Sequence, residues 1–344
     1  MTITAGLDVG GAHLKLALVE NSVPTTVAQF VCPLWQGIDK LDTALAAAQP
    51  LLNRADRIAI TMTGELSDLF ESRLHGVTTL VERLSTKLGD NVRYWQGQRG
   101  FGTPDCAIEH HADVGSTNFL ATASVVAAQL GNAMLLDFGS TTADIIAVVD
   151  GKPIPQGMTD AVRQTNGELI YTGYTRTAVM GVTQKAPFKG QWVGLAREYL
   201  ATMADVRRIL DELDPELDLH ATADGRGKSL GESTQRLARM LGRDASEGSH
   251  NDWLVTARYI EECQLRSIHD GLLTVLSRHP TLTTERLICA GIGFGAGIKL
   301  ATRLAMEPIT FGDLVGANGA LSLDATYAAP ATAVALLLEK NSLT

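Results

Sequence analysis

The chain has 344 residues, of which 45% are hydrophobic, 5% aromatic and 19% charged. Its formal net charge of −9 excludes the broad basic surface that nucleic acids and anionic membranes require, so we expect neither as a partner; a local group of cations can still bind a small anion. The length predicts two domains, and the abundance of small residues favours a closely packed α/β protein.

The four cysteines lie far apart and form no C-x-x-C pair, which predicts reduced thiols rather than a zinc or redox site. The N-terminus lacks the charged and apolar regions of a signal peptide, and no apolar run approaches the roughly 18 residues that a membrane-spanning helix needs. We therefore expect a cytoplasmic protein.

The N-terminal segment is predicted to form a β-hairpin. Residues 3–8 read as one strand, Gly10 and Gly11 as its turn, and residues 14–19 as the second strand. The first strand ends in Asp8, so a carboxylate lies at its tip. The bare backbone of the glycines lets N–H groups point at an anion.

The rest of the first half alternates helices and strands. Thr63-Gly64-Glu65-Leu66 follows a buried-looking strand, and loop and strand share residues 92–106. Apolar spacing and composition predict helices over residues 37–54, 77–87 and 118–130, and a strand over residues 57–62.

The second half restarts with the same pattern. A strand over 133–137 ends in Asp137, a turn with Gly139, Ser140 and Thr141 follows, and a second strand covers 144–149. Two such tips facing each other could hold a phosphate chain and Mg²⁺ between two related domains. Asp144 and Asp160 lie near this turn, either supporting the site or serving as ordinary turn residues.

The remaining chain is predicted to be mostly helical. Residues 197–270 read as helical and charged, with 218–229 as the least ordered part. A strand over 286–290 runs into a turn with Gly291, Gly293 and Gly295, and then into a helix that ends near residue 305. A last helix over about 331–340 would run back to close the first domain.

The order of two hairpins and a late glycine turn resembles the actin, sugar kinase and Hsp70 superfamily. The resemblance implies an α/β fold with two actin-like (ribonuclease H-like) domains, whose mixed sheets are flanked by helices around a central cleft. The first domain would comprise residues 1–122 and the C-terminal segment 328–344. The second would comprise 123–327, with a helical insertion at about 197–270.

The superfamily also implies roles for the glycine turns. Asp8 and Asp137 would be the metal-holding carboxylates, with Mg²⁺ as the cofactor. Three groups of residues would bind phosphate or nucleotide: Gly10, Gly11 and Lys15; Gly139, Ser140 and Thr141; and Gly291, Gly293 and Gly295. Many relatives have Thr or Asn where this chain has His13, which either donates to an anionic oxygen or is a tolerated turn residue.

Three segments, residues 61–68, 139–146 and 167–177, resemble the hydantoinase A and oxoprolinase branch. Within it they are most similar to short proteins linked to tetrahydromethanopterin one-carbon metabolism, whose archaeal members are methylofuran-biosynthesis transferases. The resemblance implies transfer of an aminomethylfuran from its diphosphate to a tyramine- or tyrosine-type phenol, with release of pyrophosphate.

That chemistry assigns further candidate residues. Lys15, Arg163 and Arg176 would contact the diphosphate, since a guanidinium binds phosphate oxygens in pairs. Glu65 or Glu168 would serve as the base for the phenol. Each also has a structural interpretation: the arginines could pair with acids, and Glu65 could cap a helix.

Two other functions fit the same turns. One is an ATP-dependent small-molecule kinase or amide-ring hydrolase, and the other is a non-catalytic, nucleotide-binding regulator. In the transferase interpretation ATP could bind but would not be consumed, and the partners would be a small-molecule diphosphate and a phenolic acceptor. The oligomeric state is not predicted.

Overall fold

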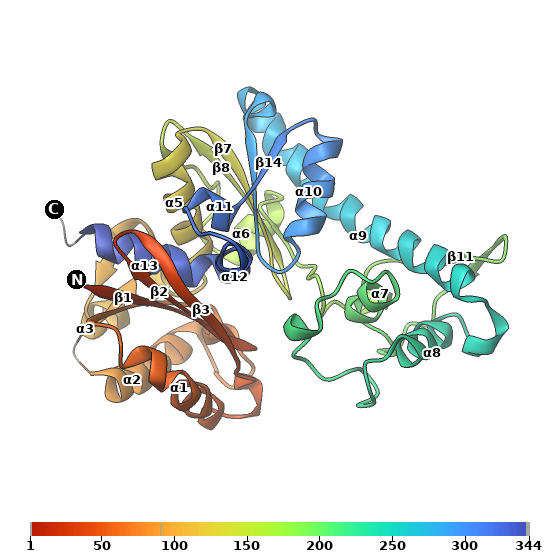
Figure 1. The fold of residues 1–344 in the computed structure, drawn as a ribbon, viewed down its shortest axis with the longest axis horizontal. Helices are drawn as coiled ribbons and strands as arrows, with labels where there is room; N and C mark the ends of the chain where they lie inside the picture. The colour runs from red at the N-terminus through yellow and green to blue at the C-terminus, as the bar shows by residue number, and fades with distance from the viewer. Residues whose placement is uncertain (1, 90, 342–344) are drawn as a thin grey trace.

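The computed structural model describes residues 2–89 and 91–341. Two lobes, each built on a mixed β-sheet, lie beside a helical region that one long helix connects to the second lobe (Figure 1). Residues 342–344 of the predicted C-terminal segment lie outside the described residues, as do positions 1 and 90 of the predicted first domain.

The first lobe contains a sheet with the strand order β3-β2-β1-β4-β5-β6. In its centre, β1 is antiparallel to β2 and parallel to β4. The strand β3 was not predicted: it lies at the edge of the sheet with mostly half-buried side chains, so its apolar pattern is weak. The strands are β1 (Ile3–Val9), β2 (His13–Glu20), β3 (Val23–Val31), β4 (Arg57–Met62), β5 (Val92–Trp95) and β6 (Phe101–Gly102).

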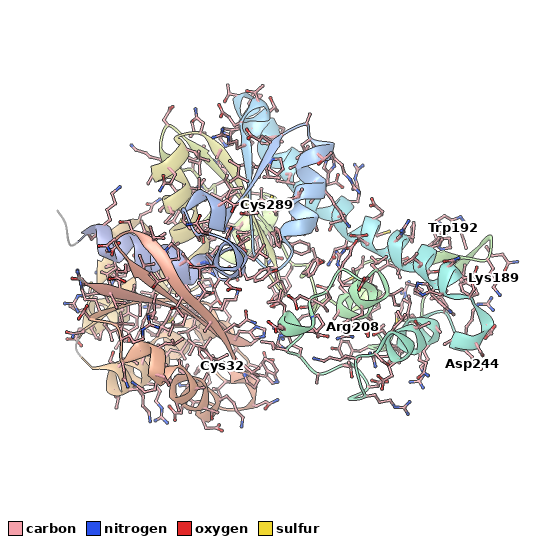
Figure 2. The ribbon with its side chains drawn as sticks, viewed as in Figure 1. Cys32, Lys189, Trp192, Arg208, Asp244 and Cys289 are labelled. Carbon is pink, nitrogen blue, oxygen red and sulfur yellow. The ribbon has the colours of Figure 1, made fainter. Side chains whose placement is uncertain are left out.

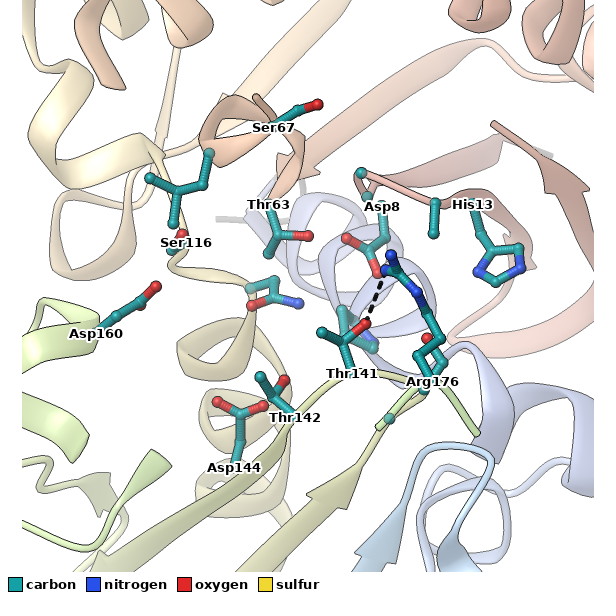
Figure 3. A pocket seen from close by; sticks show the side chains of 18 of the residues that line it. Asp8, His13, Thr63, Ser67, Ser116, Thr141, Thr142, Asp144, Asp160 and Arg176 are labelled. Carbon is teal, nitrogen blue, oxygen red and sulfur yellow. Dashed lines mark hydrogen bonds between the residues drawn. The ribbon is translucent and has the colours of Figure 1, made fainter. Parts of the chain in front are cut away.

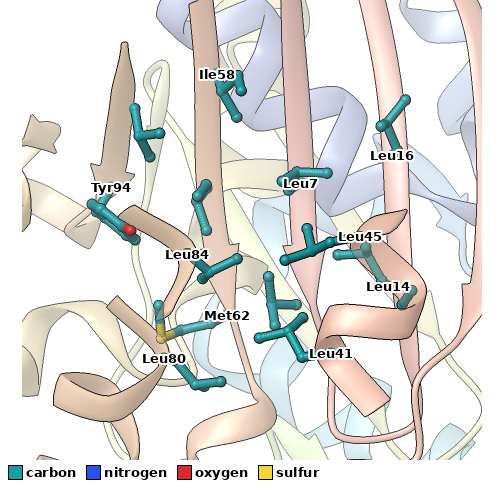
Figure 4. Packing of buried hydrophobic residues seen from close by; sticks show 14 of the residues in the cluster. Leu7, Leu14, Leu16, Leu41, Leu45, Ile58, Met62, Leu80, Leu84 and Tyr94 are labelled. Carbon is teal, nitrogen blue, oxygen red and sulfur yellow. The ribbon is translucent and has the colours of Figure 1, made fainter. Parts of the chain in front are cut away.

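Two predicted helices cover one face of this sheet. Leu7 and Leu16 from the strands share a buried cluster with Leu41 and Leu45 of α1 (Asp39–Leu52) and with Leu80 and Leu84 of α2 (Arg73–Leu88) (Figure 4). Both predictions are confirmed. The second helix begins earlier than expected because the Ser72 hydroxyl accepts a hydrogen bond from the His75 N–H at 3.1 Å and caps it.

The C-terminal helix α13 (Ala329–Asn341) packs against β1 and β2 on the other face. The close approach requires Gly6, because a Cβ atom at that position would lie 1.9 Å from the Ala331 carbonyl oxygen. The C-terminal segment therefore covers the strand that carries Asp8.

The second sheet repeats the plan of the first. Its order is β10-β8-β7-β13-β14, with β9 also paired to β8, and β7 is antiparallel to β8 and parallel to β13. The predicted repeat of strand, turn and strand is thus a repeat of topology. The strands are β7 (Ala133–Phe138), β8 (Ala143–Val149), β9 (Lys152–Pro153), β10 (Leu169–Ile170), β13 (Arg286–Ala290) and β14 (Glu307–Thr310).

Helix α5 (Asn118–Leu130) contacts both α13 and the second sheet. The predicted domain boundary at residues 122 and 123 falls within this continuous helix, and the division into two domains stays a prediction.

The helical region has a core of its own. Val206 of α7 (Met203–Ile209), Leu237 of α8 (Leu230–Met240) and Trp253 share one buried cluster. Trp253 belongs to the 29-residue helix α9 (His250–Arg278), whose second half enters the core of the second lobe. The hairpin of β11 (Lys185–Phe188) and β12 (Gln191–Gly194), which was not predicted, packs on α9 and carries Trp192 (Figure 2).

The segment between Asp218 and Ser229 forms no helix or strand, yet it is held by side-chain hydrogen bonds. Asp224 accepts hydrogen bonds from the Arg226 N–H at 3.1 Å and from Arg236 Nη1 at 3.0 Å. The missing periodicity thus marks an irregular but hydrogen-bonded segment.

Shorter helices connect these elements. They are η1 (Leu34–Gln36), η2 (Gly64–Leu66), η3 (Gly97–Arg99), α3 (Pro104–Glu109), α4 (His111–Val114), α6 (Asp160–Thr165), η4 (Val179–Gly181), η5 (Pro215–Leu217), η6 (Ala245–Glu247), η7 (Pro280–Thr284), α10 (Phe294–Arg303), α11 (Phe311–Leu314) and α12 (Ala320–Tyr327). Within the described ranges, no single helix has the length and apolar composition to cross a membrane; α12 and α13 meet the criterion only jointly, across a 95° bend.

Candidate active site

Two matching turns form the centre of the site. The Gly10 N–H donates to the His13 carbonyl and the Gly139 N–H donates to the Thr142 carbonyl, both at 2.9 Å. The register places Asp8 opposite Lys15 in the first hairpin, and Asp137 opposite Asp144 in the second. The two hairpins therefore share a geometry but differ in charge, because an acid in the second takes the place of the lysine.

A cleft of about 590 Å³ lies between these turns (Figure 3). It is lined by most of the residues that the sequence predicts for the site. They are Asp8, Gly10, Gly11, His13, Lys15, Asp137, Gly139, Ser140, Thr141, Arg163 and Arg176.

For other cleft-lining residues the sequence predicted no role, or left two alternative roles open. Trp35, Thr63 and Ser116 reach the cleft from the first lobe, and Asp144 and Asp160 from the second. Asp144 could have been found from the sequence, since it stands seven residues after Asp137, as Lys15 does after Asp8. Nothing local marks Trp35 or Ser116.

Two buried carboxyl groups, Asp8 and Asp137, and the partly buried Asp144 give the cleft its electrostatic character. Burial, opposed by Lys15 and assisted by Asp144, raises the pKa of Asp8 to about 6. Burial and the nearby Asp144 raise the pKa of Asp137 to about 7, and burial also raises the pKa of Asp144 despite its contact with Arg163. The three groups are thus costly to ionise together unless a cation joins them.

The donor set fits a magnesium ion. Asp8 Oδ1 is buried without a hydrogen-bond partner, and carboxylate oxygens are ligands that Mg²⁺ prefers. Over the described residues, no group of three or more His, Cys, Asp and Glu side chains is arranged to hold a metal. Asp8 and Asp137 suit an ion that takes one or two carboxylates and completes its shell with water and phosphate oxygens.

The two predicted arginines differ in their contacts. Arg163 is buried, donates to Asp144 Oδ1 at 2.9 Å and to the Glu168 carbonyl at 3.1 Å, and lies over the ring of Phe119. Arg176 donates to Thr141 Oγ1 at 3.2 Å and has no carboxylate partner among the described residues. Arg176 is thus the arginine with donors left for a bound anion, whereas Arg163 is largely occupied in holding Asp144.

His13 and Lys15 complete the first turn. Burial, together with His220, Lys15 and Arg176, lowers the pKa of His13 to about 2, so its imidazole is neutral at physiological pH. Its Nε2 atom is buried without a hydrogen-bond partner. Lys15 Nζ donates to the Tyr327 carbonyl at 3.0 Å, which anchors the ammonium at the floor of the cleft.

Neither predicted base lines the cleft. Glu65 is 1% exposed and accepts a hydrogen bond from Ser116 Oγ at 2.7 Å, and burial raises its pKa to about 7. Glu168 is also buried and accepts from the Gln156 N–H at 2.7 Å. Glu65 is therefore connected to the cleft through Ser116, while Glu168 supports the wall.

The late glycine turn also lies behind the cleft wall. Gly291 has φ +76°, and a Cβ atom there would lie 2.6 Å from Asp137 Oδ1. Gly293 packs on the Phe138 ring, and Gly295 has no atom within 4 Å of its Cβ position. None of the three is among the cleft-lining residues, and their predicted role toward a nucleotide stays a prediction.

Two mixed sheets of the same topology, with their hairpins facing one cleft, define an actin-like ATPase fold. A nucleotide-free structure of acetone carboxylase has this fold too: it matches with a TM-score of 0.51 and 10% sequence identity, over 88% of this chain and 67% of that chain. This similarity concerns the fold alone.

The chain belongs to the hydantoinase/oxoprolinase family, whose model matches residues 56–340, and the predicted family is confirmed. It is 27% identical, over 98% of its length and 97% of the relative's, to (4-{4-[2-(gamma-L-glutamylamino)ethyl]phenoxymethyl}furan-2-yl)methanamine synthase of Methanocaldococcus jannaschii. A protein of the same name from Methanococcus vannielii is 27% identical over 62% of this chain and 92% of that protein.

Proposed function

We propose that this protein is a transferase of methylofuran biosynthesis, which couples an aminomethylfuran diphosphate to a tyramine- or tyrosine-type phenol. The observation that carries the proposal is the similarity along the whole chain to the synthase of M. jannaschii. That relative's name describes a compound in which a phenoxymethyl ether joins a substituted phenyl ring to a furan methanamine.

The reaction forms one bond and breaks another. The phenol oxygen bonds to the furan methylene carbon, and the bond from that carbon to the diphosphate oxygen breaks. Pyrophosphate leaves with the bonding electron pair, and the phenol loses its proton. Because the furan ring stabilises positive charge on its methylene group, the main task of the protein is to neutralise the departing pyrophosphate.

The cleft offers suitable groups for this task. Backbone N–H groups of the two glycine turns, the Ser140 and Thr141 hydroxyls and the Arg176 guanidinium would contact the diphosphate oxygens. Asp8 and Asp137 would hold Mg²⁺, which when bound supplies positive charge to the leaving group. Lys15 beside Asp8 adds a further positive charge at the same turn.

The central experiment is a coupling assay with purified protein, Mg²⁺, aminomethylfuran diphosphate and either γ-glutamyl-tyramine or tyrosine. We expect an ether product by mass spectrometry together with one equivalent of pyrophosphate. Folded, Mg²⁺-loaded protein that forms no product with either acceptor would contradict the proposal.

Nucleotide binding separates this function from the kinase, hydrolase and regulator alternatives. A ligand at about 100 times its dissociation constant stabilises a protein by roughly 2.7 kcal/mol, which a thermal melt detects. We expect stabilisation by Mg²⁺ with pyrophosphate, and no loss of ATP during coupling. Product formation that depends on ATP hydrolysis would favour an alternative.

The predicted base is tested by two amide variants. A general base contributes about 10²- to 10⁴-fold to the rate. If Glu65 or Glu168 has this role, Glu65→Gln or Glu168→Gln will lower kcat in that range and remove an ionisation from the pH profile. If both variants keep their profiles, the base lies elsewhere.

A further inference from the structure

A second hollow of about 370 Å³ adjoins the cleft. It shares Trp35 and Arg176 with the cleft, so the two spaces meet at these side chains. We call it the aromatic hollow and define it by Trp35, Arg176, Tyr199, Arg208, Asp218 and His220.

Residues far apart in the sequence build this hollow. Trp35 belongs to η1 in the first lobe, Tyr199 precedes α7, and His220 lies in the irregular segment before α8. The His220 ring contacts His13 with centroids 4.5 Å apart and lies 6.5 Å from the Trp35 ring. The hollow thus forms only where the helical region meets the first lobe.

Aromatic faces in the hollow are exposed. Trp35 is 43% exposed and Tyr199 is 54% exposed, whereas Trp95 and Trp253 are buried. Exposed aromatic surface that surrounds a hollow suits a flat apolar ligand. Trp35 lies near Arg176 and the His220 ring, yet much of its surface stays exposed, and Tyr199 is more exposed still.

The charges favour a neutral or anionic group next to Arg176. Arg208 is neutralised by Asp218 at 2.7 Å and Asp205 at 2.7 Å. Arg176 has no carboxylate partner in the described part of the chain, and its guanidinium lies 5.2 Å from the centre of the Trp35 ring. An ammonium group beside Arg176 would be repelled, so the uncharged phenol end of the acceptor suits this position and the ammonium group of the acceptor must point away from it.

We propose that the aromatic hollow binds the phenolic acceptor, with its ring against Trp35 and Tyr199 and its hydroxyl directed into the cleft beside Arg176 and His13. This inference rests on the proposed function. The phenol oxygen can accept a hydrogen bond from Arg176, whose guanidinium has no carboxylate partner among the described residues. The phenol oxygen then enters the cleft at the turn that would carry the diphosphate.

The arrangement also separates the acceptor from Glu65, one of the two predicted bases. Ser116 and Asp160 lie at the end of the cleft opposite to His13 and Arg176 (Figure 3). An acceptor in the aromatic hollow therefore approaches from the side away from the Ser116–Glu65 pair. The acidic Asp160 end is left for the aminomethyl group of the donor substrate.

The test compares Trp35→Leu and Tyr199→Leu with Trp192→Leu. Trp192 is also exposed, but it lies on the β11–β12 hairpin and lines neither space. Loss of a ring contact should raise the KM for γ-glutamyl-tyramine about tenfold in the first two variants. In Tyr199→Leu, whose side chain does not line the cleft, the KM for the furan diphosphate should change less than twofold. Trp35→Phe should restore most of the acceptor affinity, and Trp192→Leu should behave as wild type.

Two readouts keep the inference distinct from the proposed function. Product formation by the wild-type protein tests the function, while calorimetric binding of γ-glutamyl-tyramine tests the hollow without turnover. If the wild-type protein forms the ether and the acceptor KM is unchanged in both variants, acceptor binding in the aromatic hollow is contradicted, while the proposed transferase function is supported. Acceptor binding that Trp35→Leu abolishes would support the hollow even if no ether forms.

Discussion

The charge on single residues decides how the site responds to pH. Asp8, Asp137 and Asp144 have raised pKa values because the wall of the cleft removes them from much of the solvent and because they lie close together. A carboxyl group whose pKa is higher in the folded protein than in the unfolded chain binds more protons when folded, so its contribution to stability falls as the pH rises. Without a bound cation, ionisation of these groups should lower the free energy of unfolding as the pH rises from about 4 to about 7.

Asp137→Asn should therefore stabilise the metal-free protein at pH 8. The pKa of Asp137 rises from 3.8 to about 7. We expect a gain of about 4 kcal/mol at most at pH 8 and little change at pH 4, where the carboxyl group of the folded protein is already protonated. Thermal melts at both pH values measure this, with the exposed Asp270→Asn as a control. A gain that is the same at both pH values would exclude ionisation as its cause.

Glu65 allows a similar test away from the glycine turns. Burial raises its pKa from 4.5 to about 7, while Gly76 and Gly115 leave no room around it. Glu65→Gln keeps an oxygen for the Ser116 hydroxyl and removes the charge, so it should be more stable than wild type above pH 7, by about 3 kcal/mol at most. The difference should vanish near pH 4.5. Denaturant unfolding across this range gives the answer.

At the scale of elements, close packing of α13 against β1 fixes the position of the strand that carries Asp8. Gly6 lies under α13, and a Cβ atom there would meet the Ala331 carbonyl at 1.9 Å. The helix can move away only by lifting off β1, which carries Asp8 two residues later. The position of the carboxylate thus depends on a glycine that itself contacts no ligand.

Gly6→Ala should destabilise the protein by about 1–3 kcal/mol, the usual range for overpacking. Gly181→Ala is the matched control, because no atom lies within 4 Å of its Cβ position. Chemical denaturation of both variants measures the difference. Equal stabilities would show that α13 adapts without strain.

At the scale of the whole molecule, α9 connects the helical region to the second lobe. Arg207 of α7 is fully buried and donates to Glu261 at 2.5 Å and to Gln264 at 2.8 Å, both on α9. Lys299 of α10 reaches the same Glu261 at 2.8 Å. This network therefore joins the region that carries Tyr199 and His220 to the lobe that carries Asp137.

Arg207→Met should loosen this connection. Breaking a buried ion pair typically costs about 3–5 kcal/mol, because the remaining charge loses its partner. Hydrogen exchange should rise first in α7 and α8, with the β7–β8 hairpin protected. Arg266→Met removes an exposed ion pair with Asp270 and should change neither the stability nor the hydrogen exchange of the protein. Uniform loss of protection in Arg207→Met would argue against a separate helical unit.

The sequence by itself determined the local features of this protein. Each hairpin and its glycine turn follows from residues within about ten positions, so the tips at Asp8 and Asp137 and the repeat of topology could be predicted. The opposed charges at Lys15 and Asp144 were readable from equal spacing. Short-range backbone preferences and alternating apolar residues suffice for such features.

Only the tertiary structure decided which side chains reach the cleft. Glu65 and Glu168 follow promising motifs but are buried behind the wall, and Arg163 is bound to Asp144. Trp35, Tyr199 and His220 come from three separate segments with no shared pattern. Their approach depends on how α9 and α13 pack against the sheets, and packing between distant segments leaves no local signal in the sequence.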